Sequence, residues 1–81
     1  MDRTLYLKLC QKVAVLPGGI GGIKQNVPEE LCVFYKNQKY YPHAYMMAFD
    51  EADGEPLHIA ILHDMDANSI RHVDLQKVFS A

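Results

Sequence analysis

The sequence predicts a mainly β domain, a small barrel of five to six antiparallel strands with a short C-terminal helical turn. Residues 43–64 contain two apolar runs of strand length on either side of Asp53 and Gly54. An Asp-Gly pair in this position is a strong hairpin signal, because glycine adopts positive φ at little cost. Other short apolar runs are separated by turn-forming residues at intervals of about ten residues. Closure into a barrel removes the exposed edges that so small a sheet otherwise has.

Length and composition predict one soluble domain that spans residues 1–81. A chain of 81 residues cannot hold a second hydrophobic core, and 49% hydrophobic with 22% charged residues is ordinary for a globular domain. The net charge of −2 gives no general attraction to nucleic acid or to an anionic membrane. Lys8 and Lys12 interrupt the N-terminal apolar stretch, and no run has the length of a membrane span. We therefore expect a cytoplasmic protein.

Residues 4–15 are predicted to form a half-buried first strand. Most apolar side chains of this run share one parity, whereas the other parity is mainly polar. A helix remains an alternative, because apolar residues also recur at intervals of three or four: Leu5, Leu9, Val13 and Leu16. The run ends at Pro17, and residues 17–22 hold four of the five glycines and are expected to form a loop.

The remaining chain is predicted to form two hairpins and a final short element. Residues 31–35 and 40–45 pair across a polar turn at 36–39, with Pro42 at an edge or a bulge. If the second hairpin has a two-residue loop, His43 lies opposite Asp64 and both faces of the hairpin are largely apolar. Such a hairpin is either covered on both sides or contacts another molecule. A turn follows at 66–69, and 75–79 closes the chain as a helical turn or a last strand.

Two resemblances follow from these segments. A long first strand, a glycine-rich loop, a three-stranded meander and a final V-x-L-x-x-V segment at 73–78 together resemble an SH3-like barrel. This resemblance implies a fold and no particular function. Residues 39–78, with the phrases AILHD and ANSI, resemble small uncharacterised proteins of anaerobic gut bacteria. That second resemblance covers only the C-terminal half and implies no activity.

The sequence predicts no bound nucleotide, calcium or other cofactor. In residues 17–24, Ile23 precedes Lys24 where a phosphate-binding loop requires glycine. Residues 64–68 match the opening D-x-D-x-N of a calcium loop. However, Ser69 and Leu75 occupy the positions that require glycine and a bidentate glutamate, so this segment is better interpreted as a turn.

The cysteines and histidines do not form a recognisable catalytic or metal-binding pattern. Cys10 and Cys32 are predicted to be buried free thiols, because neither has the spacing of a metal site or a nucleophile. On an ideal strand His58 and His63 point to opposite faces, which argues against a zinc site. We therefore predict that the protein is not an enzyme. A metal-dependent enzyme is the less favoured alternative; its pocket would be lined by His43, His63 and Asp64.

The aromatic and basic run at residues 34–45 is the strongest candidate for a binding surface. No carboxylate occurs from residue 31 to 49, whereas six occur from 40 to 70, where Lys and Arg are absent. Tyrosine rings suit interfaces because they combine a large apolar body with a hydrogen-bonding tip. The predicted binding residues are Tyr35, Lys36, Lys39, Tyr40, Tyr41, His43 and Tyr45.

We therefore predict a non-catalytic protein-interaction or accessory module that binds a still unidentified protein. The main alternative is a small barrel that binds single-stranded nucleic acid, since exposed rings stack bases and lysines hold phosphates. The two apolar faces of the second hairpin also suggest a homodimer. Its predicted interface residues are Tyr45, Met47, Phe49 and Leu62.

Overall fold

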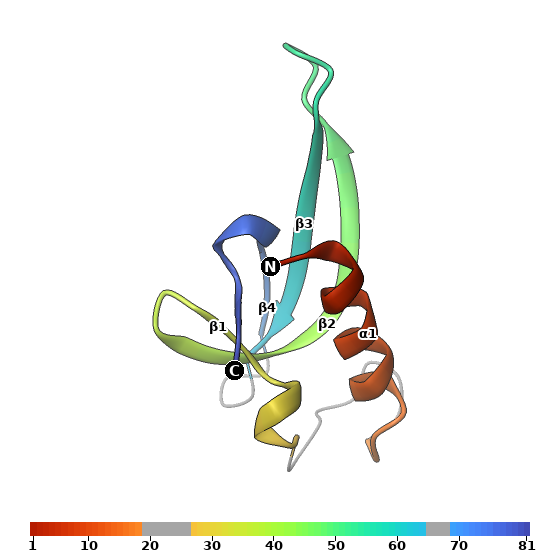
Figure 1. The fold of residues 1–81 in the computed structure, drawn as a ribbon, viewed down its shortest axis with the longest axis vertical. Coiled ribbons are helices and arrows are strands. Elements are labelled where there is room, and N and C mark those ends of the chain that lie inside the picture. The colour runs from red at the N-terminus through yellow and green to blue at the C-terminus, as the bar shows by residue number, and fades with distance from the viewer. Residues whose placement is uncertain (19–26, 65–68) are drawn as a thin grey trace.

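The computed structural model describes residues 1–18, 27–64 and 69–81 and has one short α-helix and five strands in one antiparallel sheet (Figure 1). The strand order is β4-β3-β2-β1-β5, which is an open sheet. The prediction of a mainly β domain with five antiparallel strands is confirmed. The elements are α1 (Arg3–Ala14), η1 (Glu29–Leu31), β1 (Val33–Tyr35), β2 (Gln38–Phe49), β3 (Pro56–His63), β4 (Ile70–Asp74), η2 (Leu75–Lys77) and β5 (Phe79–Ser80).

The prediction of a strand at residues 4–15 is wrong, because Arg3–Ala14 form the α-helix α1. Asp2 caps this helix, and its side chain accepts a hydrogen bond from the backbone N–H of Leu5 at 3.1 Å. The buried residues of α1 are Tyr6, Leu9, Cys10 and Val13. Their spacing of three, one and three places them on one face of a helix.

The alternation of apolar and polar residues in 4–15, which suggested a strand, does not match the burial pattern of these residues. Leu5 and Leu7, which support the strand pattern, are exposed, whereas Tyr6 and Cys10, assigned to the polar parity, are buried. The helix alternative is therefore confirmed. Its buried stripe is only partly the one that the sequence suggested, since it contains Leu9 and Val13 but not Leu5.

The predicted hairpin between β1 and β2 is confirmed, with Val33 opposite Tyr40 and Tyr35 opposite Gln38. Its turn consists of Lys36 and Asn37, whose φ angles are 50° and 64°. Positive φ at both central residues is what a type I′ turn requires, and this turn matches the twist of the flanking strands. The turn is shorter than predicted, because β2 already begins at Gln38.

The predicted hairpin between β2 and β3 is also confirmed, but its loop is longer than the two-residue loop on which the expected register was conditional. The N–H of Asp50 donates to the carbonyl of Glu55 at 3.1 Å, and the N–H of Gly54 donates to the carbonyl of Asp50 at 2.8 Å. Gly54 has a φ of 71°, whereas Asp53 does not have positive φ. Over residues 44–49 the pairing moves by two residues relative to the expected register, so the residues of this part that share each face stay the same.

A β-bulge divides β2 into two parts. The pairing of β2 with β3 changes register between Pro42 and Ala44, which leaves His43 as the extra residue. Of the two alternatives predicted for Pro42, an edge or a bulge, the structure has the bulge, which directly follows Pro42. Residues 38–40 pair with β1, and residues 41–49 pair with β3. Figure 1 shows β2 as a long curved strand that connects these two parts of the sheet.

The hydrophobic core joins α1 to the sheet and to η2. Tyr6 is fully buried, and its hydroxyl donates to the carbonyl of Ile61 at 2.9 Å, which fixes α1 to β3. The core consists of Tyr6, Leu9, Cys10, Val33, Tyr40, Ala60, Leu62, Val73, Leu75 and Val78. The C-terminal segment contains both predicted forms, the helical turn η2 and then the strand β5. The predicted loop at 17–22 and the turn at 66–69 lie largely outside the described residues.

We predict that the variant Asp2→Ala lowers the free energy of unfolding by about 1 kcal/mol, because it removes the side-chain cap of α1. Urea unfolding followed by circular dichroism measures this change. Asp2→Asn is the matched control, since its amide oxygen accepts the same hydrogen bond. Equal stability of the wild type and the Asp2→Ala variant would show that the cap contributes nothing.

Candidate functional site

The predicted binding residues do not share one exposed surface. Tyr40 and Tyr41 are only 2% and 1% exposed, so neither ring is available to a partner. Lys36 and Lys39 are exposed, and Tyr35 is half-buried at the edge of the core. The other two predicted binding residues, His43 and Tyr45, are half-buried in the second part of β2. The middle of the aromatic run, Tyr40 and Tyr41, thus lies in the protein interior. The N-terminal end of the run reaches the surface.

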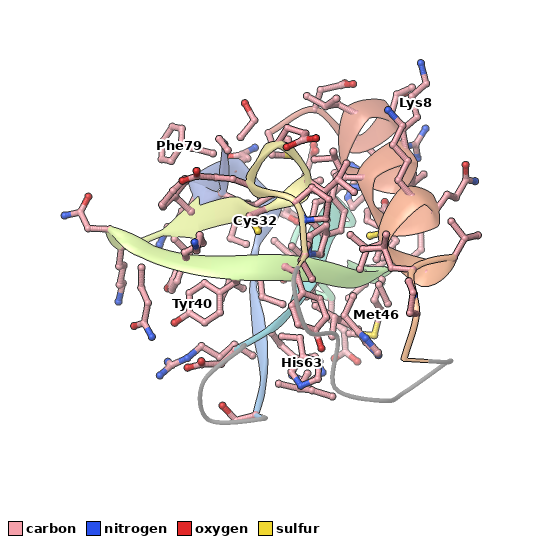
Figure 2. All side chains as sticks on the ribbon, turned by 90° about the horizontal axis from the view of Figure 1, so that it is seen from below. Lys8, Cys32, Tyr40, Met46, His63 and Phe79 are labelled. Atoms are coloured by element: carbon pink, nitrogen blue, oxygen red, sulfur yellow. The ribbon has the colours of Figure 1, made fainter. Side chains whose placement is uncertain are left out.

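At that end, three side chains form a row across three strands, which we call the aromatic-basic row: Lys39, Phe34 and Phe79. Phe34 of β1 lies opposite Lys39 of β2 on one side and opposite Phe79 of β5 on the other. Directly opposed residues of antiparallel strands share one face of the sheet, so the three side chains are neighbours. Phe79 is 67% exposed, and Figure 2 shows its ring on the side of the sheet that faces away from Tyr40.

The β1–β2 turn carries a further cation, Lys36, which contacts Tyr35. The Lys36 ammonium lies 5.4 Å from the centroid of the Tyr35 ring, which is within the range of a cation–π interaction. Because side chains alternate along a strand, Tyr35 points to the face opposite to that of Phe34. The Lys36 ammonium is therefore directed to the face opposite to the row, where the Tyr35 ring packs partly against the core.

Phe34 and Phe79 were absent from the residues predicted from sequence. Phe34 belonged to the aromatic run, but the sequence did not show on which face of β1 it lies. Phe79 is distant from that run in the chain, and only the pairing of β1 with β5 brings it there. The one available signal was the interpretation of residues 75–79 as a possible last strand.

The electrostatic environment of this end of the molecule is of mixed sign. Burial raises the pKa of the Cys32 thiol, next to β1. Nearby Lys39 lowers this pKa, and Glu29 and Glu30 of η1 raise it. Positive and negative groups therefore both act at short range here. The surface is not a uniformly positive track.

The buried and half-buried histidines have structural partners. The Tyr41 hydroxyl and Nδ1 of His63 share a hydrogen bond inside the protein, and the rings of His43 and His63 meet edge to face at 5.9 Å between centroids. The Tyr45 hydroxyl and Nδ1 of His58 share another hydrogen bond, at 2.5 Å. The roles of His43, His58 and His63 are therefore structural, because their rings take part in the packing and hydrogen bonding of the sheet.

The pairing of His43 with Asp64, which a two-residue loop would give, does not occur. Tyr41 lies opposite His63, and His43 occupies the bulge, which has no direct cross-strand partner. Asp64 instead accepts a hydrogen bond from the Gln38 side-chain amide at 3.3 Å. Within residues 1–18, 27–64 and 69–81, no three His, Cys, Asp or Glu side chains gather in a way that could hold a metal ion.

The prediction that both cysteines are buried free thiols is confirmed. Burial raises the pKa of Cys10 to about 11, and a hydrogen bond with Tyr6 only partly opposes this effect. A catalytic cysteine needs the opposite, a lowered pKa in an accessible position. The environment of Cys10 is therefore that of a core residue.

Exposed apolar side chains occupy the end of the β2–β3 hairpin, which we call the hairpin arm (residues 46–49 and 56–58). β4 pairs with β3 only over residues 59–63, so the arm extends beyond it. Figure 1 shows the arm projecting past α1 and the other strands. Of the predicted dimer residues, Met47 and Phe49 are exposed, Tyr45 is half-buried and Leu62 is fully buried. Leu62 therefore belongs to the core and is not available to a second copy.

Both faces of the arm are apolar, in agreement with the sequence pattern. Met47 and Phe49 point to one face, and Met46 and Leu57 point to the other. All four side chains are exposed by more than 40%. The arm is thus a second candidate interaction surface, separate from the aromatic-basic row.

No family model matches this chain, and no curated protein or solved structure matches it significantly. The candidate surfaces therefore depend on the geometry alone. In the described part of the chain, no helix has the length and apolar character needed to cross a membrane.

We predict that the free energy of unfolding falls as the pH rises from 9 to 11. The Cys10 thiol of the unfolded chain ionises near its ordinary pKa of 9.0, whereas the folded protein keeps the proton until about pH 11. Ionisation in this window therefore favours the unfolded state, and the stabilisation is fully present below pH 9. Burial also raises the pKa of the Tyr6 phenol, which acts in the same direction.

Urea unfolding at a series of pH values measures this slope. The variant Cys10→Ala should have a shallower slope between pH 9 and 11, whatever its absolute stability. Identical slopes in the variant and the wild type would contradict the assignment to Cys10.

Proposed function

We propose that this protein is a non-catalytic interaction module that binds a partner protein through the aromatic-basic row. The single observation that supports this proposal most is the exposed Phe79 ring beside Phe34 and Lys39. An exposed aromatic ring with a flanking cation is the composition of a protein-binding hot spot. The partner chemistry that fits is an apolar or aromatic group next to a carboxylate.

The strand arrangement supports the further proposal that the sheet belongs to an SH3-like barrel. The strand order brings the first strand, β1, beside the last strand, β5, and η2 links β4 to β5. The bulge in β2 lets one strand serve both the β1–β5 part and the β3–β4 part of the sheet. A strand that bends in this way is how a small sheet curls toward closure.

Single-stranded nucleic acid is the less favoured ligand. Binding to a polyanion requires a basic groove together with exposed rings on which bases stack. Here Glu29 and Glu30 as well as Lys39 act on Cys32, so both signs of charge occur at this end, and Tyr40 and Tyr41 are buried. A surface of mixed charge fits a folded protein better. Two free buried thiols fit a reducing compartment, which supports the proposal that the protein acts in the cytoplasm.

We predict that truncating the row removes partner binding. The immobilised protein is exposed to a lysate of its source cell, and the captured proteins are identified and their affinity is then measured. Phe79→Ala and Lys39→Glu should each weaken the affinity by about tenfold or more, as expected for hot-spot residues.

The chain offers matched controls for both changes. Ile70→Ala removes an exposed apolar side chain of β4, and Arg71→Glu reverses an exposed charge on the same strand, outside both the row and the hairpin arm. Both controls should bind like the wild type. Equal binding by the row variants and the wild type would refute the proposal. Tight binding of a labelled oligonucleotide with steep salt dependence would favour the nucleic-acid alternative instead.

A further inference from the structure

We propose that the hairpin arm forms a two-fold symmetric homodimer, in which the free edge of β2 pairs antiparallel with the same edge of a second copy. This inference uses a different surface from the aromatic-basic row and does not depend on it. The proposed pairing is centred on Met47, so that Tyr45 of each copy lies opposite Phe49 of the second copy.

The first argument is that, among the described residues, no strand pairs with this edge of β2. β1 pairs with β2 only over residues 38–40, so no described strand lies along the other side of residues 45–49. The Asp50 N–H bonds toward β3, and hydrogen-bonding direction alternates along an antiparallel strand. The N–H and C=O groups of Tyr45, Met47 and Phe49 therefore point away from β3.

The second argument is that β2 lacks the features that normally protect an edge. The edge strand β4 carries Arg71, His72 and Asp74, and β5 has only two residues. Charged side chains and short length are both devices that prevent edge pairing. Residues 44–49 contain neither a charge nor a proline and continue for six residues. This edge is therefore the one suited to accept another strand among the described residues.

The third argument selects a second copy of this chain as the occupant. Because residues 44–49 are uncharged, pairing the strand with itself brings no like charges together, and it forms two Tyr–Phe pairs across the interface. Antiparallel pairing also sends the tip of one arm toward α1 of the other copy. That tip carries Asp50, Glu51, Asp53 and Glu55, whereas the charged residues of α1 are all cations: Arg3, Lys8 and Lys12. Opposite charges thus meet at both ends of the proposed interface.

Sedimentation equilibrium of the full chain tests this proposal. The expected result is a mass that rises from 9.2 kDa toward twice this value at high micromolar concentration, with weaker association at high salt. A mass that stays at 9.2 kDa over the whole concentration range would overturn the proposal.

Two variants test the geometry of the interface. Met47→Lys places two like charges beside each other at the two-fold axis and should raise the dimer dissociation constant by about tenfold or more. The matched control is Leu57→Lys, which adds the same charge at an equally exposed position of the arm but on β3, away from the free edge. It should leave the dissociation constant near the wild-type value.

Met47→Pro separates edge pairing from simple packing of apolar faces. The Met47 N–H points to the free edge, so proline removes a hydrogen bond between copies and none within the β2–β3 pair. Circular dichroism checks that the variant stays folded. Loss of the dimer in a folded Met47→Pro variant supports edge pairing, and an unchanged dimer refutes it. If Met47→Pro unfolds, the contrast between Met47→Lys and Leu57→Lys decides. Phe79→Ala should not alter the mass, which keeps this test independent of the proposed function.

Discussion

The bulge at His43 is the constraint on which the rest of the structure depends. Without it, the twelve residues of β2 would form one regular strand, and a single partner on each side could follow its whole length. The bulge interrupts the register between Pro42 and Ala44 and bends the strand. One half of β2 then belongs with β1 and β5, and the other half belongs with β3 and β4. Both candidate surfaces result from this division.

The division also explains why the aromatic run does not form one surface. Tyr40 lies before the bulge and contributes to the central core, while Tyr41 packs against His63 beside it. Two adjacent tyrosines normally point to opposite faces of a strand, and one of them is usually exposed. Here both rings are buried, so they provide no exposed aromatic surface. An exposed ring lies instead at the end of the sheet that β1 and β5 form. There, Phe79 supplies a ring that lies far from the tyrosines in the chain.

The hairpins could be predicted from sequence because their signals are local. Asn37 and Gly54 provide the positive φ that each turn needs, and this conformation does not depend on contacts with the rest of the chain. The helix at residues 3–14 was only the alternative, because Leu5 and Leu9 fit a strand as well as a helical stripe, and the capping role of Asp2 was not recognised. The position of Phe79 depends on pairing across 45 residues, which no local pattern contains. The burial of Tyr41 depends on the bulge in the same non-local way.

The two proposed surfaces complement each other physically. A row of three residues is small, and a protein interface of usual strength involves about 20–30 residues on each side. A single copy would thus bind its partner weakly through the row alone. Pairing through the arm leaves the row uncovered, because the arm and the row lie on opposite sides of the bulge. The proposed dimer would therefore carry two aromatic-basic rows. A partner with repeated binding sites would then gain avidity without any new contact. In the proposed dimer, self-association through the β2 edge would strengthen binding at the row, and the absence of charge and proline from residues 44–49 is compatible with such pairing.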